Sequence, residues 1–146
     1  RQMCKETDQE EGLKLLSGKV DSLPSKIAFR PKFIKQSSCI KVFDKLYLFI
    51  SKANIKKPVE ERFDALFHEI GHWLHFQNIP PLKECREVWK NANLEKIKED
   101  VSEYAVKKDD GREFVAEVFK GLVKGKKYDE YIMNLYKRLH GPIPHD

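Results

Sequence analysis

Three residues of one short segment have the types and the spacing needed to bind and use a metal ion. His68, Glu69 and His72 form the pattern H-E-x-x-H. On an α-helix, positions four apart share one face, so both imidazoles can reach the same ion. Glu69 follows His68 by one position, about 100° further round the helix. Its carboxylate can there accept a proton from an attacking water. Two ligands and a base are the minimum set of a zinc peptidase.

A third ligand must come from elsewhere, since a catalytic zinc usually has three protein ligands and one open position. Glu113 and Glu117 lie four apart in the apolar segment 113–119. Solitary buried carboxylates would be unfavourable there. Both are satisfied if one binds the ion and the other accepts a hydrogen bond from a ligand histidine. The alternative reading of the spacing is an exposed pair on an amphipathic helix.

The remaining histidines are weaker candidates for the third ligand. His75 lies one turn beyond His72, and a straight helix does not easily wrap three ligands round one ion. His140 and His145 lie in a tail that contains Gly141, Pro142 and Pro144. We therefore expect the third ligand in the segment 113–119.

The helix that carries the two histidines is expected to have Pro58 at its first position and to end at Asn78-Ile79-Pro80-Pro81. Apolar residues recur in it at helical spacing; these are Val59, Phe63, Leu66, Phe67, Ile70 and Leu74. Gly71 in a helix interior costs about 1 kcal/mol relative to alanine. Its presence therefore predicts that another element approaches closely beside the metal.

The flanking segments predict an α+β domain that spans residues 1–146. A helix is expected from Asp8 to about Val20, and a β-hairpin at about 39–51, with Asp44 at its turn. Further helices are expected at 82–92, 94–106, 111–123 and 128–139, the third with an N-cap at Asp109–Asp110. The expected architecture is a small twisted β-sheet packed on the active-site helix, followed by a mainly helical C-terminal half.

The composition is that of a globular chain, with 146 residues, 40% hydrophobic and 35% charged, and a net charge of +5. The basic residues are spread out, which favours solvated loops over a nucleic-acid surface.

No apolar run reaches the length of a membrane span, and no signal peptide is visible. Because the chain begins with Arg1, we allow for a fragment of a larger protein, and secreted and intracellular locations both stay open. The cysteines Cys4, Cys39 and Cys85 form no metal-binding pair.

The motifs together resemble a known family of peptidases. His68-Glu-Ile-Gly-His72, then Tyr104, then Glu113-Phe-Val-Ala-Glu117-Val-Phe is similar to the catalytic domain of anthrax lethal factor. Lethal-factor-like gluzincins share the pattern, including Pro-Pro endopeptidases and metallopeptidase domains of phages and polymorphic toxins. The resemblance covers roughly residues 45–122 and is specific because the glutamate helix follows H-E-x-x-H.

The resemblance implies a role for each matching residue. His68, His72 and Glu113 would hold one Zn²⁺ per chain, and Glu117 would support a ligand histidine. Tyr104 would face the scissile carbonyl, whereas spacing alone also allows a core tyrosine packed against residues 97–101. The family further implies a strand, here Leu46–Ile50, that runs along the cleft and pairs with an extended peptide substrate.

The expected function is therefore that of a zinc endopeptidase with Glu69 as general base. Two alternatives stay open. A toxin or virion protein could use the fold as a metal-binding module without turnover, although such a site needs no base. A nucleic-acid-associated peptidase would require a clustered basic patch, which the sequence does not contain. The sequence does not determine the oligomeric state.

Overall fold

The computed structural model describes residues 11–20, 23, 27–30, 38–42, 45–51, 59–78 and 82–145. In the strands and at residues 59–62 and 78, it describes the backbone but not the side chains. Residues 11–17 are helical. The strands are β1 (Ile27–Arg30), β2 (Ser38–Val42) and β3 (Lys45–Ser51). The helices are α2 (Val59–Asn78), α3 (Leu82–Lys90), α4 (Leu94–Asp100), the 3-10 turn η2 (Tyr104–Val106), α5 (Arg112–Val123) and α6 (Glu130–Arg138).

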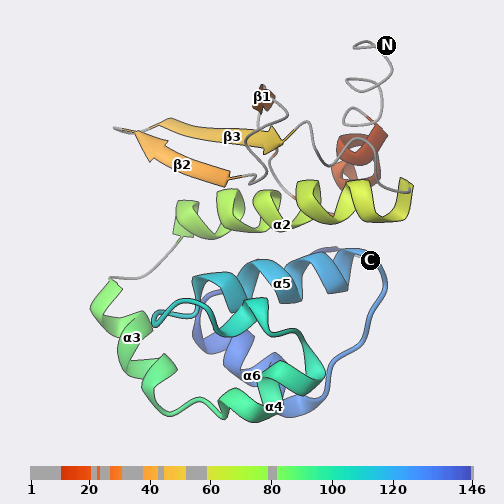
Figure 1. Ribbon diagram of the computed structural model, residues 1–146. Coiled ribbons are helices and arrows are strands. Elements are labelled where there is room, and N and C mark those ends of the chain that lie inside the picture. The colour runs from red at the N-terminus through yellow and green to blue at the C-terminus, as the bar shows by residue number, and fades with distance from the viewer. Residues whose placement is uncertain are drawn as a thin grey trace.

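Helix α2 runs through the middle of the molecule and ends at Asn78, where the sequence predicts its end, whereas the expected first residue, Pro58, lies outside the described residues. Figure 1 shows it between the three strands on one side and α5 on the other. Its apolar stripe is buried as predicted at Leu66, Phe67, Ile70 and Leu74. The side chain of Val59 lies outside the described residues. A helix covered on two sides can bury polar side chains as well as apolar ones, which is the environment that the two histidines require.

Gly71 allows α5 to lie directly against α2. A Cβ atom at this position would come within 3.1 Å of the Ala116 backbone and 3.2 Å of the Phe119 Cβ. Contacts this short are rare for real side chains, so any larger residue would push the two helices apart. The close approach expected at Gly71 is confirmed. It brings the glutamate face of α5 against the histidine face of α2.

The start of α5 differs from the expectation by one to two residues. The N-cap is Gly111, in the left-handed conformation at φ 78°, and not Asp109 or Asp110. Asp110 still helps to begin the helix, because its carboxylate accepts hydrogen bonds from the Arg112 backbone N–H (3.1 Å) and guanidinium Nε (2.9 Å). Glycine suits the cap because only glycine adopts this conformation without a Cβ penalty.

The predicted helix 94–106 is wrong as one continuous element. It is divided into α4, which ends at Asp100, and the short turn η2, which begins at Tyr104. Tyr104, which helical spacing alone would allow in the core, is 42% exposed. The break turns the backbone, so a residue that helical spacing assigns to the core is presented to the surface instead.

The three strands form a sheet in the order β1-β3-β2. β1 pairs parallel with β3, and β2 pairs antiparallel with it, with Cys39 opposite Leu48. β3 is therefore the central strand: β1 pairs with its residues Leu48–Ser51, and β2 with its residues Lys45–Phe49. Leu48 and Phe49 are paired on both sides and cannot also pair with a substrate. For the rest of Leu46–Ile50, pairing with a substrate stays a prediction.

The expected α+β class is corrected by the part of the chain whose side chains are described. Those residues are 69% helical and include no strand. The described core is supplied by the N-terminal helical segment and the later helices, with its largest buried side chains at Leu16, Leu66, Ile70, Phe114, Phe119 and Tyr136. Fold class depends on which elements bury side chains together, and here those elements are helices.

Two general expectations can be placed on the described residues. Cys85 is a buried free thiol, whereas Cys4 and the side chain of Cys39 lie outside them. No helix in this part of the chain has both the length and the apolar composition needed to cross a membrane.

Candidate metal centre

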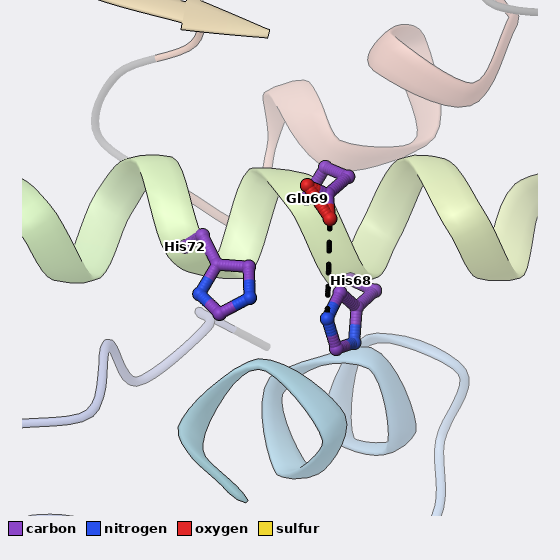
Figure 2. Close-up of side chains that lie close together, drawn as sticks. All are labelled: His68, Glu69 and His72. Atoms are coloured by element: carbon purple, nitrogen blue, oxygen red, sulfur yellow. Dashed lines mark ion pairs between the residues drawn. The ribbon is translucent and has the colours of Figure 1, made fainter. Parts of the chain in front are cut away.

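His68 and His72 lie one turn apart on α2, and their rings share one side of the helix (Figure 2). The ring centroids are 4.8 Å apart, at an interplanar angle of 83°. Glu69 is next to them, with its Oε1 3.9 Å from His68 Nε2. All three side chains are buried. His68, Glu69 and His72 therefore form a buried group that could hold a metal ion.

Glu113 on α5 faces both histidines. Its Oε1 lies 2.6 Å from His72 Nε2, and its Oε2 lies 3.4 Å from His68 Nε2. Atoms bound to a tetrahedral zinc at ~2.0–2.1 Å lie ~3.4 Å from one another. The distance from Glu113 to His68 therefore fits such a site directly, and the distance to His72 would have to increase by less than ~1 Å. Glu113 comes closer to the His68 Nε2 atom, at 3.4 Å, than Glu69 does, at 3.9 Å. Its carboxylate therefore lies within reach of both Nε2 atoms.

Glu117 orients His68 from the other side of the ring. The Nδ1–H of His68 donates a hydrogen bond of 2.8 Å to Glu117 Oε2. With Nδ1 protonated, the Nε2 atom keeps its lone pair and faces Glu113. Lys120 Nζ lies 3.0 Å from the same Glu117 oxygen. Glu117 therefore supports a histidine and does not face the space between the two Nε2 atoms.

Ser102 belongs to the same network and was not anticipated from the sequence. Its hydroxyl donates a 2.8 Å hydrogen bond to Glu117 Oε1 and accepts one of 3.2 Å from the Ala105 backbone N–H. It thus connects the carboxylate behind His68 to the turn η2, which carries Tyr104. A serine two residues before Tyr104 and fifteen before Glu117 has no periodic signal. Its role could have been found only from the fold.

Tyr104 lies over the histidine pair. Its ring is edge-on to that of His68, with centroids 5.4 Å apart. Burial and the charge of Glu113 raise the pKa of its phenol to about 12, so the hydroxyl is protonated and can donate a hydrogen bond at neutral pH. Because Tyr104 is 42% exposed, the core position that spacing also allowed is excluded.

Comparison with known proteins adds no assignment. No family model, curated protein or solved structure matches this chain. What the site can do therefore has to follow from its own residues and their geometry.

The other histidines lie away from this group. His75 is buried on α2, and its Nε2–H donates a 2.8 Å hydrogen bond to the Leu139 carbonyl. Burial lowers the pKa of His75 to about 4, so it is neutral. His140 Nε2 is 4.0 Å from Glu84 Oε1, and the His145 backbone N–H donates to the Lys19 carbonyl at 2.6 Å. These three residues hold other parts of the fold together.

The electrostatics of the site favour a bound cation. Burial by itself lowers the pKa of His68, but hydrogen bonds to Glu113 and Glu117 raise it to about 9. Burial by itself raises the pKa values of the two glutamates, but the histidines hold that of Glu113 well below its usual range and bring that of Glu117 to about 2. A second proton on the His68 imidazole therefore offsets part of the carboxylate charge. A metal ion would replace that proton, because its histidine ligands must be neutral.

Proposed function

We propose that this chain is a zinc-dependent endopeptidase. The observation that carries the proposal is the position of Glu113, whose two oxygens lie 2.6 and 3.4 Å from the Nε2 atoms of His72 and His68. Two imidazoles and one carboxylate are a ligand set of catalytic zinc sites, which leave one position open. The likeness of the motifs to lethal-factor-like peptidases leads to the same three ligands.

The donor set fits a divalent cation in chemistry and in charge. Glu113 and Glu117 are both buried, and Glu117 also contacts the ammonium of Lys120. With both imidazoles neutral, the negative charge of Glu113 would be balanced by a cation bound beside the two Nε2 atoms. Imidazole nitrogen together with carboxylate oxygen suits zinc. His68, His72 and Glu113 would hold the ion.

Each residue of the site then has a distinct part in hydrolysis. A zinc ion, when bound, would lower the pKa of a water molecule and polarise the peptide carbonyl. Glu69 accepts the proton of the attacking water and delivers it to the leaving amine. Tyr104 donates a hydrogen bond to the carbonyl oxygen as negative charge develops on it. Glu117 keeps His68 in the required tautomer.

The substrate is proposed to be a protein or peptide bound in an extended conformation. Among the strands described here, β1 and β2 are the edge strands of the sheet. A peptide that adds to this sheet would use one of these edges. The cleavage sequence does not follow from the site.

The decisive experiment is cleavage of a peptide library by the metal-loaded protein, with and without a chelator. We expect cleavage that the chelator abolishes and that added zinc restores, because the ion would activate the water. Zinc content is measured in parallel. Cleavage that persists with the chelator would exclude a metallopeptidase, and bound zinc without any cleavage would favour a non-catalytic metal-binding module.

The two glutamates of α5 should differ in their effect on zinc affinity. Glu113→Ala removes a proposed ligand, whereas Glu117→Ala removes only the partner of His68, a loss that typically costs about 10–100-fold. We therefore expect the weaker zinc binding at Glu113→Ala, as measured by competition titration against a chelating dye. The two variants are matched controls for each other. Equal losses, or a larger loss at Glu117, would reverse the two roles.

A further inference from the structure

A cavity of about 460 Å³ lies between α3, α4 and the residues that follow η2. Its apolar lining is formed by Trp89, Ala92, Leu94 and Val106. The volume falls within the ~300–1,000 Å³ of sites that take small ligands. We call it the Trp89 cavity. Its apolar surface is suited to one aliphatic or aromatic side chain.

The rest of the lining of the Trp89 cavity is mostly basic. Arg86, Lys90, Lys107 and Lys108 contribute to it, together with a single acidic residue, Asp109. The side chains of Arg86 and Lys90 are 53% and 73% exposed. Arg86 reaches Asp109 only at 3.8 Å. Four cations and one carboxylate give the cavity an excess of positive charge, which favours an anionic partner.

One residue of the cavity lining lies close to the candidate metal centre. Lys107 lines the cavity, and its Nζ also lies 5.0 Å from the centroid of the Tyr104 ring. The same ring lies 5.4 Å from that of His68. The cavity and the metal centre are therefore neighbours, and one extended peptide could contact both.

We propose that the Trp89 cavity binds an acidic segment of the peptide substrate. One apolar side chain of that segment occupies the space beside Trp89 and Val106, and flanking carboxylates lie on Arg86 and Lys108. This inference rests on the proposed peptidase function, because that function makes a peptide the occupant. It adds a substrate class, acidic with an apolar anchor, that the metal site itself does not specify.

A nucleic acid would also be attracted by the basic residues, but the aromatic residue is badly placed for it. Trp89 is 6% exposed, and its ring packs at 5.5 Å from that of Phe114. Single-stranded nucleic acid is held by aromatic faces that are open for stacking on bases. A buried ring that forms only an apolar wall favours a peptide side chain.

The test measures binding without turnover. The protein is the full chain carrying Glu69→Gln, loaded with zinc, and the probe is a fluorescein-labelled peptide with a single leucine between runs of glutamate. Fluorescence anisotropy gives its Kd. Comparison peptides carry lysine in place of glutamate, or serine in place of leucine. A single-stranded oligonucleotide with the same label tests the other polyanion.

The cavity variant is Arg86→Glu with Lys108→Glu, and its matched control is Lys83→Glu with Lys98→Glu. The control changes the net charge equally at exposed lysines of α3 and α4 outside the lining. We expect the cavity variant to weaken binding of the acidic peptide by about tenfold or more, as reversed charges facing an anionic partner should. The control should change Kd by less than about twofold, because exposed charges outside the cavity are screened from a peptide bound there.

The proposal is supported if the acidic leucine peptide binds best and only the cavity variant, folded as judged by its melting curve, loses it. Equal binding of the lysine peptide, equal losses in both double variants, or tighter binding of the oligonucleotide would overturn it. Because no cleavage is measured, failure of the wild-type protein to hydrolyse peptides would count against the peptidase alone. A peptidase that binds the probe independently of Arg86 and Lys108 would count against the cavity alone.

Discussion

Glu69→Gln is expected to lower kcat by on the order of 10²–10⁴ while leaving about one zinc per chain. The carboxylate is buried and lies 3.9 Å from His68 Nε2, further than the 3.4 Å of Glu113. Glutamine has nearly the same shape but cannot accept the proton of the attacking water. The measurements are steady-state hydrolysis of a peptide from the library and zinc content by atomic absorption.

Glu99→Gln provides the matched control for this variant. Glu99 is an exposed residue of α4, so the same chemical change should leave both kcat and zinc content as in the wild-type protein. Hydrolysis by Glu69→Gln at the wild-type rate would exclude Glu69 as the base. Loss of zinc from a folded Glu69→Gln protein would instead make Glu69 a ligand.

Tyr104→Phe is expected to lower kcat by on the order of 10²–10³, the usual loss when one oxyanion donor is removed. The ring is held edge-on to His68 at 5.4 Å, and the raised pKa of about 12 keeps the hydroxyl protonated. Since this hydrogen bond strengthens in the transition state, KM should change little. Kinetics with the same peptide separate the two parameters.

Tyr131→Phe is the control for the loss of a tyrosine hydroxyl. Tyr131 is 37% exposed, close to the exposure of Tyr104, and its hydroxyl accepts a 2.7 Å hydrogen bond from the Asn93 backbone N–H. This variant should lose some stability and retain kcat. If folded, zinc-loaded Tyr104→Phe also retains kcat, Tyr104 has no part in the mechanism and the metal alone would stabilise the oxyanion.

Local periodicity was sufficient to place the helices that carry the candidate site. The four-residue spacing of His68 and His72, and of Glu113 and Glu117, has its meaning only on helices, and both segments contain enough apolar residues to be recognised as helical. The end of α2 at Asn78 also follows from the sequence. A close contact at Gly71 could also be predicted, because glycine in a helix interior is costly unless another backbone lies against it.

The class of the domain did not follow from local patterns. Alternating and apolar runs at 39–51 suggested a sheet as one layer of an α+β core, whereas the part of the chain with described side chains is helical. A strand pattern indicates an extended backbone, but the partners of that strand are set by long-range packing. The central position of β3, which leaves Leu48 and Phe49 paired on both sides, is a property of the topology and has no signal in its own residues.

The spacing of the residues alone determined that His68, Glu69 and His72 could hold and use a metal ion. Only the tertiary structure placed Glu113 between the two imidazoles, Glu117 behind His68, and Tyr104 on an exposed turn beside them. It also revealed Ser102 and Lys107, which lie before and after η2. Ser102 hydrogen-bonds Glu117, and Lys107 lies over the ring of Tyr104. The physical reason is that helical spacing encodes neighbours within one element, whereas contacts between elements depend on how the helices pack.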